Sequence, residues 1–195
     1  MKLYDADASG NCYKVRLFAA LANIELETVA VDIPGGAHKR PPLSELNPLG
    51  QLPVLEDGAQ VVRDSQAILV YLAGAYGGLA WWPAHPQGQA DIVQWLSFAA
   101  NEIQHSLCAA RLVRKFGYAL DQAAALAKSP GVLALLDKHL ERHDWLALGR
   151  PTIADCAVYP YVVLAPEGDV ELKPYNHVAR WIERLEGLPG YLPKP

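Results

Sequence analysis

The hydrophobic pattern of this chain changes character once, at about residue 78. Before that point, strand-like segments such as "KLYDA" and "ELETVAVDI" alternate with segments whose apolar residues have helical spacing. After it no strand signal of note follows, and the apolar residues keep a helical spacing. The pattern therefore predicts an α/β domain over residues 1–78 and an all-α domain over residues 87–195.

The segment "GGLAWWPAHPQG" separates the two patterns and is rich in glycine, proline and tryptophan. Such a composition interrupts regular structure, so we expect residues 79–86 to form an inter-domain linker. Trp81 and Trp82 are expected to fill the junction between the domains rather than to bind a ligand.

Composition narrows the class of protein. With 195 residues, 51% of them hydrophobic and 19% charged, the chain can bury a substantial core. The net charge is −4 and no basic block interleaved with aromatic residues occurs, which argues against nucleic acid as a partner. No apolar run approaches the roughly 20 residues that span a bilayer, so no membrane association is expected. The three cysteines are far apart, which predicts free thiols and a reducing, cytoplasmic location.

A hydroxyl, an amide and a thiol gather at the start of the first predicted helix, in Ser9, Asn11 and Cys12. The free N–H groups and the dipole of a helix N-terminus favour an anion there. Ser9 and Asn11 could therefore activate a thiol that a ligand supplies, although Ser9 could equally be a plain helix cap. Cys12 stands where a C-x-x-C motif has its second cysteine, and it is either a reactive thiol or a small packed side chain.

Two further signals concern extended backbone and a second helix start. Leu52-Pro53 lies where a strand is expected, which marks an edge or a special turn, and a cis bond there would expose the Leu52 backbone to an extended peptide ligand. Asp64 and Ser65 open the next helix. Its N–H groups and the Ser65 hydroxyl suit a carboxylate, but plain capping explains them as well.

The second domain is expected to begin with one long amphipathic helix over residues 87–116. A short helix is expected over residues 121–128. Ser129-Pro130 then predicts the start of another helix that runs to about Leu146, with serine as its cap and proline in its first turn.

Four segments, taken in order, resemble cytosolic glutathione transferases over nearly the whole chain. They are "SGNCYKVRLFAALANIELETVAVD", "LNPLGQLPVLEDG", "DSQAILVYLA" and "RPTIADCAVYPYV". The resemblance implies a thioredoxin-like N-terminal domain, an all-helical C-terminal domain, glutathione as co-substrate, no metal, and a homodimer. It also implies that Thr152 and Asp155 form the capping box in the core of the helical domain.

The resemblance assigns roles to individual residues. It implies a cis-proline at Pro53, with the Leu52 backbone paired to the cysteinyl part of glutathione. It implies that Asp64 and Ser65 hold the γ-glutamyl carboxylate and that the catalytic residue facing the sulfur is Ser9 or Asn11. Further candidates for glutathione binding are Cys12, Lys39 and Gln51, and the candidates for the acceptor pocket are His105 and Arg111.

Serine at position 9 resembles the serine-type theta and zeta classes. The zeta class, with maleylacetoacetate isomerase activity, has Ser-Ser-Cys where this chain has Ser-Gly-Asn, and the spacing Ser9-x-Asn11 is closer to the nu class. We therefore expect a transferase whose glutathione thiolate attacks a small electrophile. The alternatives are a glutathione-dependent disulfide-bond reductase, as in the nu class, and a non-catalytic, glutathione-binding regulatory scaffold.

Overall fold

The computed structural model describes residues 1–195, and its first half is built on a four-stranded sheet in the order β2-β1-β3-β4. β1 pairs with β2 in parallel and with β3 in antiparallel orientation, and β3 and β4 form a hairpin. Asp57 pairs with Gln60, so Gly58 and Ala59 make the hairpin turn. The strands are β1 (Lys2–Asp5), β2 (Glu27–Ala30), β3 (Val54–Asp57) and β4 (Gln60–Arg63).

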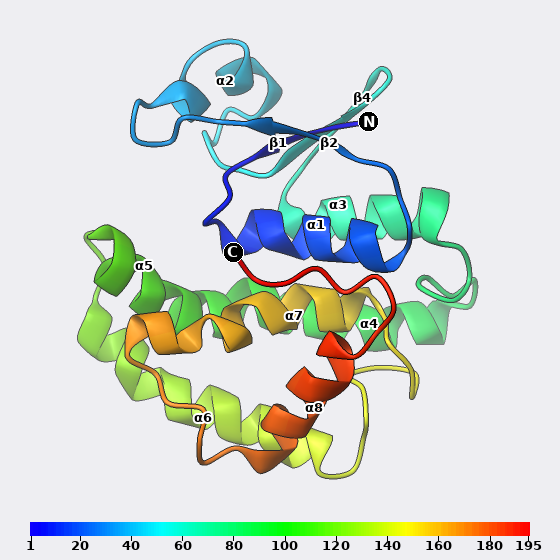
Figure 1. Ribbon diagram of the computed structural model, residues 1–195, viewed down its shortest axis with the longest axis vertical. Coiled ribbons are helices and arrows are strands. Elements are labelled where there is room, and N and C mark those ends of the chain that lie inside the picture. Colours follow the sequence, from blue (N-terminus) through cyan, green and yellow to red (C-terminus); the bar gives the residue numbers. More distant parts are fainter.

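Two helices cover the face of this sheet that is turned toward the rest of the molecule (Figure 1). They are α1 (Gly10–Leu21) and α3 (Ser65–Leu72), the second continued by the π-helical turn η2 (Ala73–Gly77). The 3₁₀ turn η1 (Ala37–Lys39) and the short α2 (Leu43–Leu46) connect β2 to β3. This α/β arrangement is the thioredoxin-like half that the sequence predicts.

The second half is entirely helical, as expected. The long helix predicted over residues 87–116 is one continuous rod, but its middle ten residues are π-helical. None of the helices combines the length and the hydrophobicity needed to cross a bilayer. The elements are α4 (Pro86–Phe98), η3 (Ala99–Cys108), α5 (Ala109–Phe116), α6 (Gln122–Leu140), α7 (Ile153–Val163), the 3₁₀ turn η4 (Ala165–Gly168) and α8 (Asn176–Glu186).

The helix boundary expected at Ser129-Pro130 is wrong, because α6 runs through both residues. Pro130 cannot donate to the Leu126 carbonyl oxygen four residues earlier, so that helix bond is lost. The Ser129 hydroxyl turns back onto its own helix and donates to the Ala125 carbonyl oxygen, 2.9 Å away. Leu133, Leu136 and Leu140 are buried on one face, so burial outweighs the local cost of the proline.

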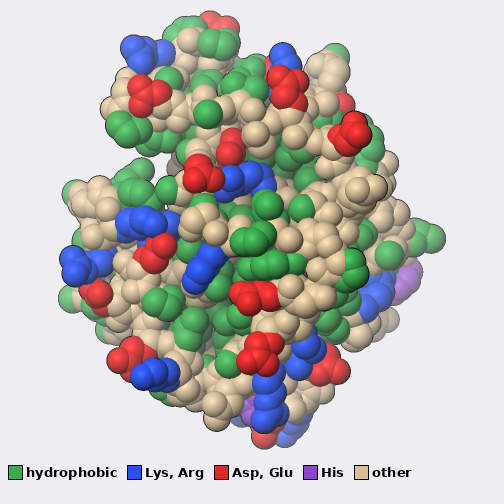
Figure 2. All heavy atoms as spheres, in the orientation of Figure 1, with side chains coloured by type: hydrophobic (Ala, Val, Ile, Leu, Met, Phe, Trp, Pro, Cys, Tyr) green, Lys and Arg blue, Asp and Glu red, His purple; other side chains and the backbone are tan.

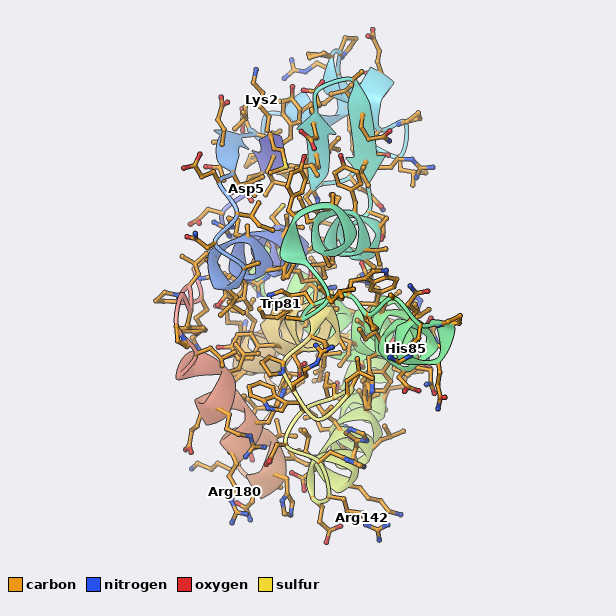
Figure 3. All side chains as sticks on the ribbon, turned by 90° about the vertical axis from the view of Figure 1, so that its right-hand side faces the viewer. Lys2, Asp5, Trp81, His85, Arg142 and Arg180 are labelled. Atoms are coloured by element: carbon orange, nitrogen blue, oxygen red, sulfur yellow. The ribbon has the colours of Figure 1, made fainter.

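One hydrophobic core of 38 buried residues joins the two halves. α7 is buried along its whole length and packs against α1 and α4 (Figure 1). At the junction the rings of Phe18 and Trp81 meet edge to face with centroids 5.2 Å apart, and Figure 3 shows Trp81 between the α/β half and the helices below it. Because the core is continuous, each half holds the other in place.

Polar contacts hold the start of α7 and the C-terminal segment in place. The predicted capping box at Thr152 and Asp155 is confirmed, and Asp155 also accepts hydrogen bonds from Leu146 N and from Trp181 Nε1. The chain after α8 returns along α1, where the Tyr13 hydroxyl donates to the Leu192 carbonyl oxygen at 2.6 Å (Figure 1).

Candidate active site

Ser9 forms the cap of α1, at the turn that follows β1. Its Oγ accepts a hydrogen bond from Cys12 N at 3.3 Å, and its side chain is half-buried. Because the Oγ acts as an acceptor in this bond, its hydrogen stays free to donate to a group at the helix end. The first N–H groups of α1 and the positive end of its dipole lie at the same place. The site therefore favours an anion.

Asn11 lies beside the start of α3, although 54 residues separate it from Ser65. The Ser65 hydroxyl lies 3.4 Å from Asn11 Oδ1 and 2.5 Å from Gln66 Oε1. The structure thus brings together the N-termini of two helices, and with them three of the side chains singled out in the sequence, Ser9, Asn11 and Ser65.

Asp64 caps α3 by accepting hydrogen bonds from Gln66 N and Ala67 N. Its φ is +75°, a conformation that non-glycine residues rarely adopt. Such backbone strain persists where the surrounding structure fixes it and is concentrated at functional sites. Asp64 is exposed, so its carboxylate faces solvent next to the Ser65–Asn11 contact.

The Leu52–Pro53 bond is cis, as the resemblance implies. A residue that the sequence did not single out holds the loop before it: Asn47 is buried, its Nδ2 donates to the Gln51 carbonyl oxygen at 2.8 Å, and its Oδ1 accepts from Leu49 N. The only local signal for this role was the turn "NPLG". The Pro41–Pro42 bond is also cis.

Lys39 and Gln51 lie on the same loop surface. Both side chains are exposed, and Lys39 Cγ passes 3.3 Å from the point where a Cβ on Gly50 would stand. Lys39 therefore lies over the turn that leads into Gln51, in a position from which both can reach a ligand beside Leu52.

The expectation that Cys12 contacts a ligand does not fit the structure. Cys12 is fully buried on the inner side of α1, and burial raises the pKa of its thiol to about 12. A thiol in this state is protonated at neutral pH, so the packed alternative accounts for Cys12. Cys108 and Cys156 are likewise free and buried.

The expected acceptor-pocket residues face elsewhere. Arg111 is 1% exposed, and its Nε lies 2.6 Å from Glu167 Oε2, a carboxylate that it shares with Lys115 inside the helical half. His105 is exposed but lines a hollow of about 380 Å³ between η3 and α6, with no residue of the β1–α1 turn in its lining. The sequence alone could not reveal the surroundings of Arg111 and His105, because both contact residues that are tens of positions away along the chain.

Figure 2 shows the surface hollowed between the two halves, on the side where Figure 1 places the β1–α1 turn and α5. Phe116, Tyr118 and Leu120 at the end of α5 and in the following loop are between 43% and 50% exposed. The basic residues of the last turn of α5 are paired, Arg114 with Asp169 and Lys115 with Glu167. The end of α5 and the loop after it thus present exposed aromatic side chains and paired charges.

A second cluster of titratable side chains lies on α6 and in the loop that follows it. His139 and His143 stack with ring centroids 4.5 Å apart, and the Trp95 ring meets His139 edge-on at 4.7 Å. No group of three His, Cys, Asp or Glu side chains lies within metal-binding reach. The two histidines border a cavity of about 430 Å³ between α4 and α6, separate from Ser9.

Comparisons with known proteins match nearly the whole chain to glutathione S-transferases. A family model described as the N-terminal domain of glutathione S-transferase matches residues 3–80, and one described as its C-terminal domain matches residues 105–189. Glutathione S-transferase 3 of Zea mays is 32% identical, over 98% of this chain and 91% of its own length. Glutathione S-transferase 2 of Anopheles gambiae is 28% identical over 97% and 92%. The crystal structure of a possible glutathione S-transferase from Rhodopseudomonas palustris is 33% identical, with a TM-score of 0.89 over 99% of this chain and 97% of that one.

Proposed function

Because the chain belongs to the glutathione S-transferase family, we propose that it binds glutathione across the starts of α1 and α3 and transfers its thiolate to a small electrophile. The family uses glutathione as its co-substrate. The observation that carries the proposal for this chain is the Ser65–Asn11 contact, which brings the start of α3, capped by Asp64, beside the first turn of α1, capped by Ser9.

Each part of the tripeptide has a chemically suitable neighbour. The N–H groups of α3 and the Ser65 hydroxyl suit the γ-glutamyl carboxylate. The exposed carboxylate of Asp64 suits the amino group of the same moiety, since opposite charges attract. The backbone of Leu52 can pair with the cysteinyl residue, and Lys39 and Gln51 reach the glycyl carboxylate.

Ser9 is proposed to ionise the thiol of bound glutathione. To bring a thiol from a pKa of ~8.5 to ~6.5 requires about 2.7 kcal/mol. A charge-assisted hydrogen bond from the Ser9 hydroxyl, together with the dipole of α1, has that magnitude. The thiolate then forms a bond to an electrophilic carbon, whose leaving group departs with the electron pair. Asn11 is the second candidate donor.

Ultraviolet absorbance of the thiolate, titrated against pH, tests this role. We expect Ser9→Ala to raise the pKa of the bound thiol, and Asn11→Ala to raise it less, because Asn11 Oδ1 already faces Ser65. Ser97→Ala on the exposed face of α4 is the matched control and should leave the titration unchanged. Equal titrations in all four proteins would refute the assignment.

A second candidate reaction is the reduction of glutathione-mixed disulfides, which the Ser9-x-Asn11 spacing favours. Here the glutathione thiolate attacks the mixed disulfide, oxidised glutathione forms, and the other thiol leaves as a thiolate. The buried Cys12 is not needed, because glutathione supplies both electrons. Turnover of an aryl halide, compared with turnover of a hydroxyethyl mixed disulfide, separates the two reactions. Binding by calorimetry without turnover of either substrate would favour the scaffold alternative.

We propose that the protein forms a homodimer through α4 and α6. Leu135 of α6 is 53% exposed and lines both hollows, and Val93 of α4 is 43% exposed. Large exposed apolar side chains that gather on one face favour association. A cytoplasmic location is also proposed, since a reducing compartment suits three free cysteines.

A further inference from the structure

Lys14 is a buried lysine without an acidic partner. Its side chain is 0% exposed, and none of the ion pairs of the chain includes it. Its ammonium lies over the ring of Tyr161, 5.2 Å from the centroid. An isolated buried cation is costly, so its retention next to a binding site calls for an explanation other than packing.

The position of Lys14 relative to the site follows from helix geometry. It lies three residues after Asn11 and four after Gly10 on α1, which is about 6 Å of helix rise. Helical side chains lean toward the N-terminus of their helix, so the long side chain of Lys14 extends back toward the first turn. The Tyr161 ring confirms this, because it contacts Lys14 and also lies 2.7 Å from the point where a Cβ on Gly10 would stand.

The groups around Lys14 do not cancel its charge. Asp64 at the start of α3 and Cys108 of η3 act on it, and Tyr161 of α7 faces it. The Cys108 thiol is protonated, since burial raises its pKa, and the pKa of Tyr161 is raised as well. Arg111, which acts on Cys108 and Tyr161, is paired with Glu167. Only Asp64 carries an opposing charge near Lys14, and it lies beyond ion-pair distance.

We propose that Lys14 is a positioning charge, whose buried ammonium beneath the first turn of α1 stabilises the thiolate of bound glutathione. The inference rests on the proposed function and adds a cation to the hydroxyl of Ser9. Burial lowers the pKa of Lys14 to about 8, which leaves most of it protonated at neutral pH. The field of a cation within roughly 10 Å, little screened by solvent, is enough to lower the thiol pKa by about one unit.

Linkage makes the effect reciprocal. If the ammonium stabilises the thiolate, the thiolate stabilises the ammonium, so saturation with glutathione raises the pKa of Lys14. This shift can be measured on the unmodified protein through the NMR signal of the lysine side-chain nitrogen. It is independent of whether any substituted protein folds, and the absence of a shift overturns the proposal.

The decisive comparison is the pH titration of bound thiolate absorbance in wild type, Lys14→Met, Lys14→Arg and Lys173→Met. We expect Lys14→Met to raise the thiol pKa by about one unit and Lys14→Arg to restore it. Lys173→Met removes the same charge from an exposed loop and should change nothing. Calorimetry first establishes glutathione binding: if wild type binds none, the proposed function itself fails. If wild type and Lys14→Met both bind and ionise glutathione equally, only the role of Lys14 is refuted.

Discussion

At Gly10 the first turn of α1 lies directly against the Tyr161 ring of the core. A Cβ there would lie 2.7 Å from Cε1 and Cζ of Tyr161, far below a normal contact distance. Tyr161 is itself buried, so its ring has little room to withdraw. The absence of a side chain at Gly10 thus allows α7 to approach the first turn of α1.

We predict that Gly10→Ala lowers the free energy of unfolding by about 1–3 kcal/mol, the cost of overpacking. Gly131→Ala is the matched control. Gly131 lies inside α6 with open space around it, so alanine should raise stability by up to about 1 kcal/mol. Chemical denaturation measures both, and an unchanged midpoint for Gly10→Ala would contradict the proposed contact.

Lys14 also makes a prediction about stability. Its pKa falls from 10.5 to about 8 on folding, which corresponds to about 3 kcal/mol of destabilisation while the lysine is charged. Replacement by methionine, of similar volume, should therefore stabilise the protein without glutathione by up to about 3 kcal/mol below pH 8.

The sign of the pH dependence follows from proton binding. Between pH 8 and 10.5 the unfolded chain binds more protons at Lys14 than the folded chain, so wild-type stability rises with pH. The advantage of Lys14→Met should shrink over this range and vanish above it. Denaturation curves at pH 7 and above pH 10.5 test this, and a constant advantage would contradict it.

Residue-scale prediction succeeded where the signal was local. Ser9 and Asp64 cap helices, and the side chains that cap helices stand next to them in sequence. It failed for Cys12 and Arg111, whose surroundings come from elsewhere in the chain. Arg111 binds Glu167, 56 residues later, and no local pattern reveals such a partner.

Among the elements, α7 is fixed by the polar contacts of its first turn. Thr152 and Asp155 are buried and close the capping box, and Asp155 extends it to Leu146 and to Trp181 of α8. A single carboxylate thus holds the start of α7, the preceding loop and α8 together.

Thr152→Ala should lower the free energy of unfolding by about 1–2 kcal/mol, because Ala154 N loses its acceptor. Thr152→Ser retains the Oγ and should lose less than half of that amount. Thermal unfolding compares the two. If both variants lose the same amount, the methyl group of Thr152 rather than its hydroxyl would be responsible.

The capping box was predictable because its two residues are three positions apart. The continuity of α6 through Pro130 was not, because the sequence signal for a helix start was genuine and only tertiary burial overrides it. The π-helical segment η3 between α4 and α5 could not be predicted from the spacing of apolar residues either, because a π-helical turn depends on the packing around it.

At the scale of the whole molecule, the exposed apolar residues of α4 and α6 predict the oligomeric state. Leu135→Glu should convert the proposed dimer to a monomer, because a charge would have to be buried in the interface. Leu120→Glu, on the exposed loop before α6 and outside the lining of both hollows, is the control and should stay dimeric. Analytical ultracentrifugation measures both, and a monomeric wild type would refute the dimer.

The order of the two halves, the sheet and the helical bundle followed from the hydrophobic pattern. Their relative placement did not, because it depends on how Phe18, Trp81 and α7 fit together across the junction.

The contact surface between the two halves, here called the seam, limits which halves can be exchanged between related proteins. Since Tyr161 presses on Gly10 and Trp81 on Phe18, the surface of each half is shaped to one counterpart. A chimera that joins this thioredoxin-like half to the helical half of a distant relative would bring mismatched side chains to that seam. New substrate preferences can therefore arise by recombination of halves only between proteins whose side chains at the seam are compatible.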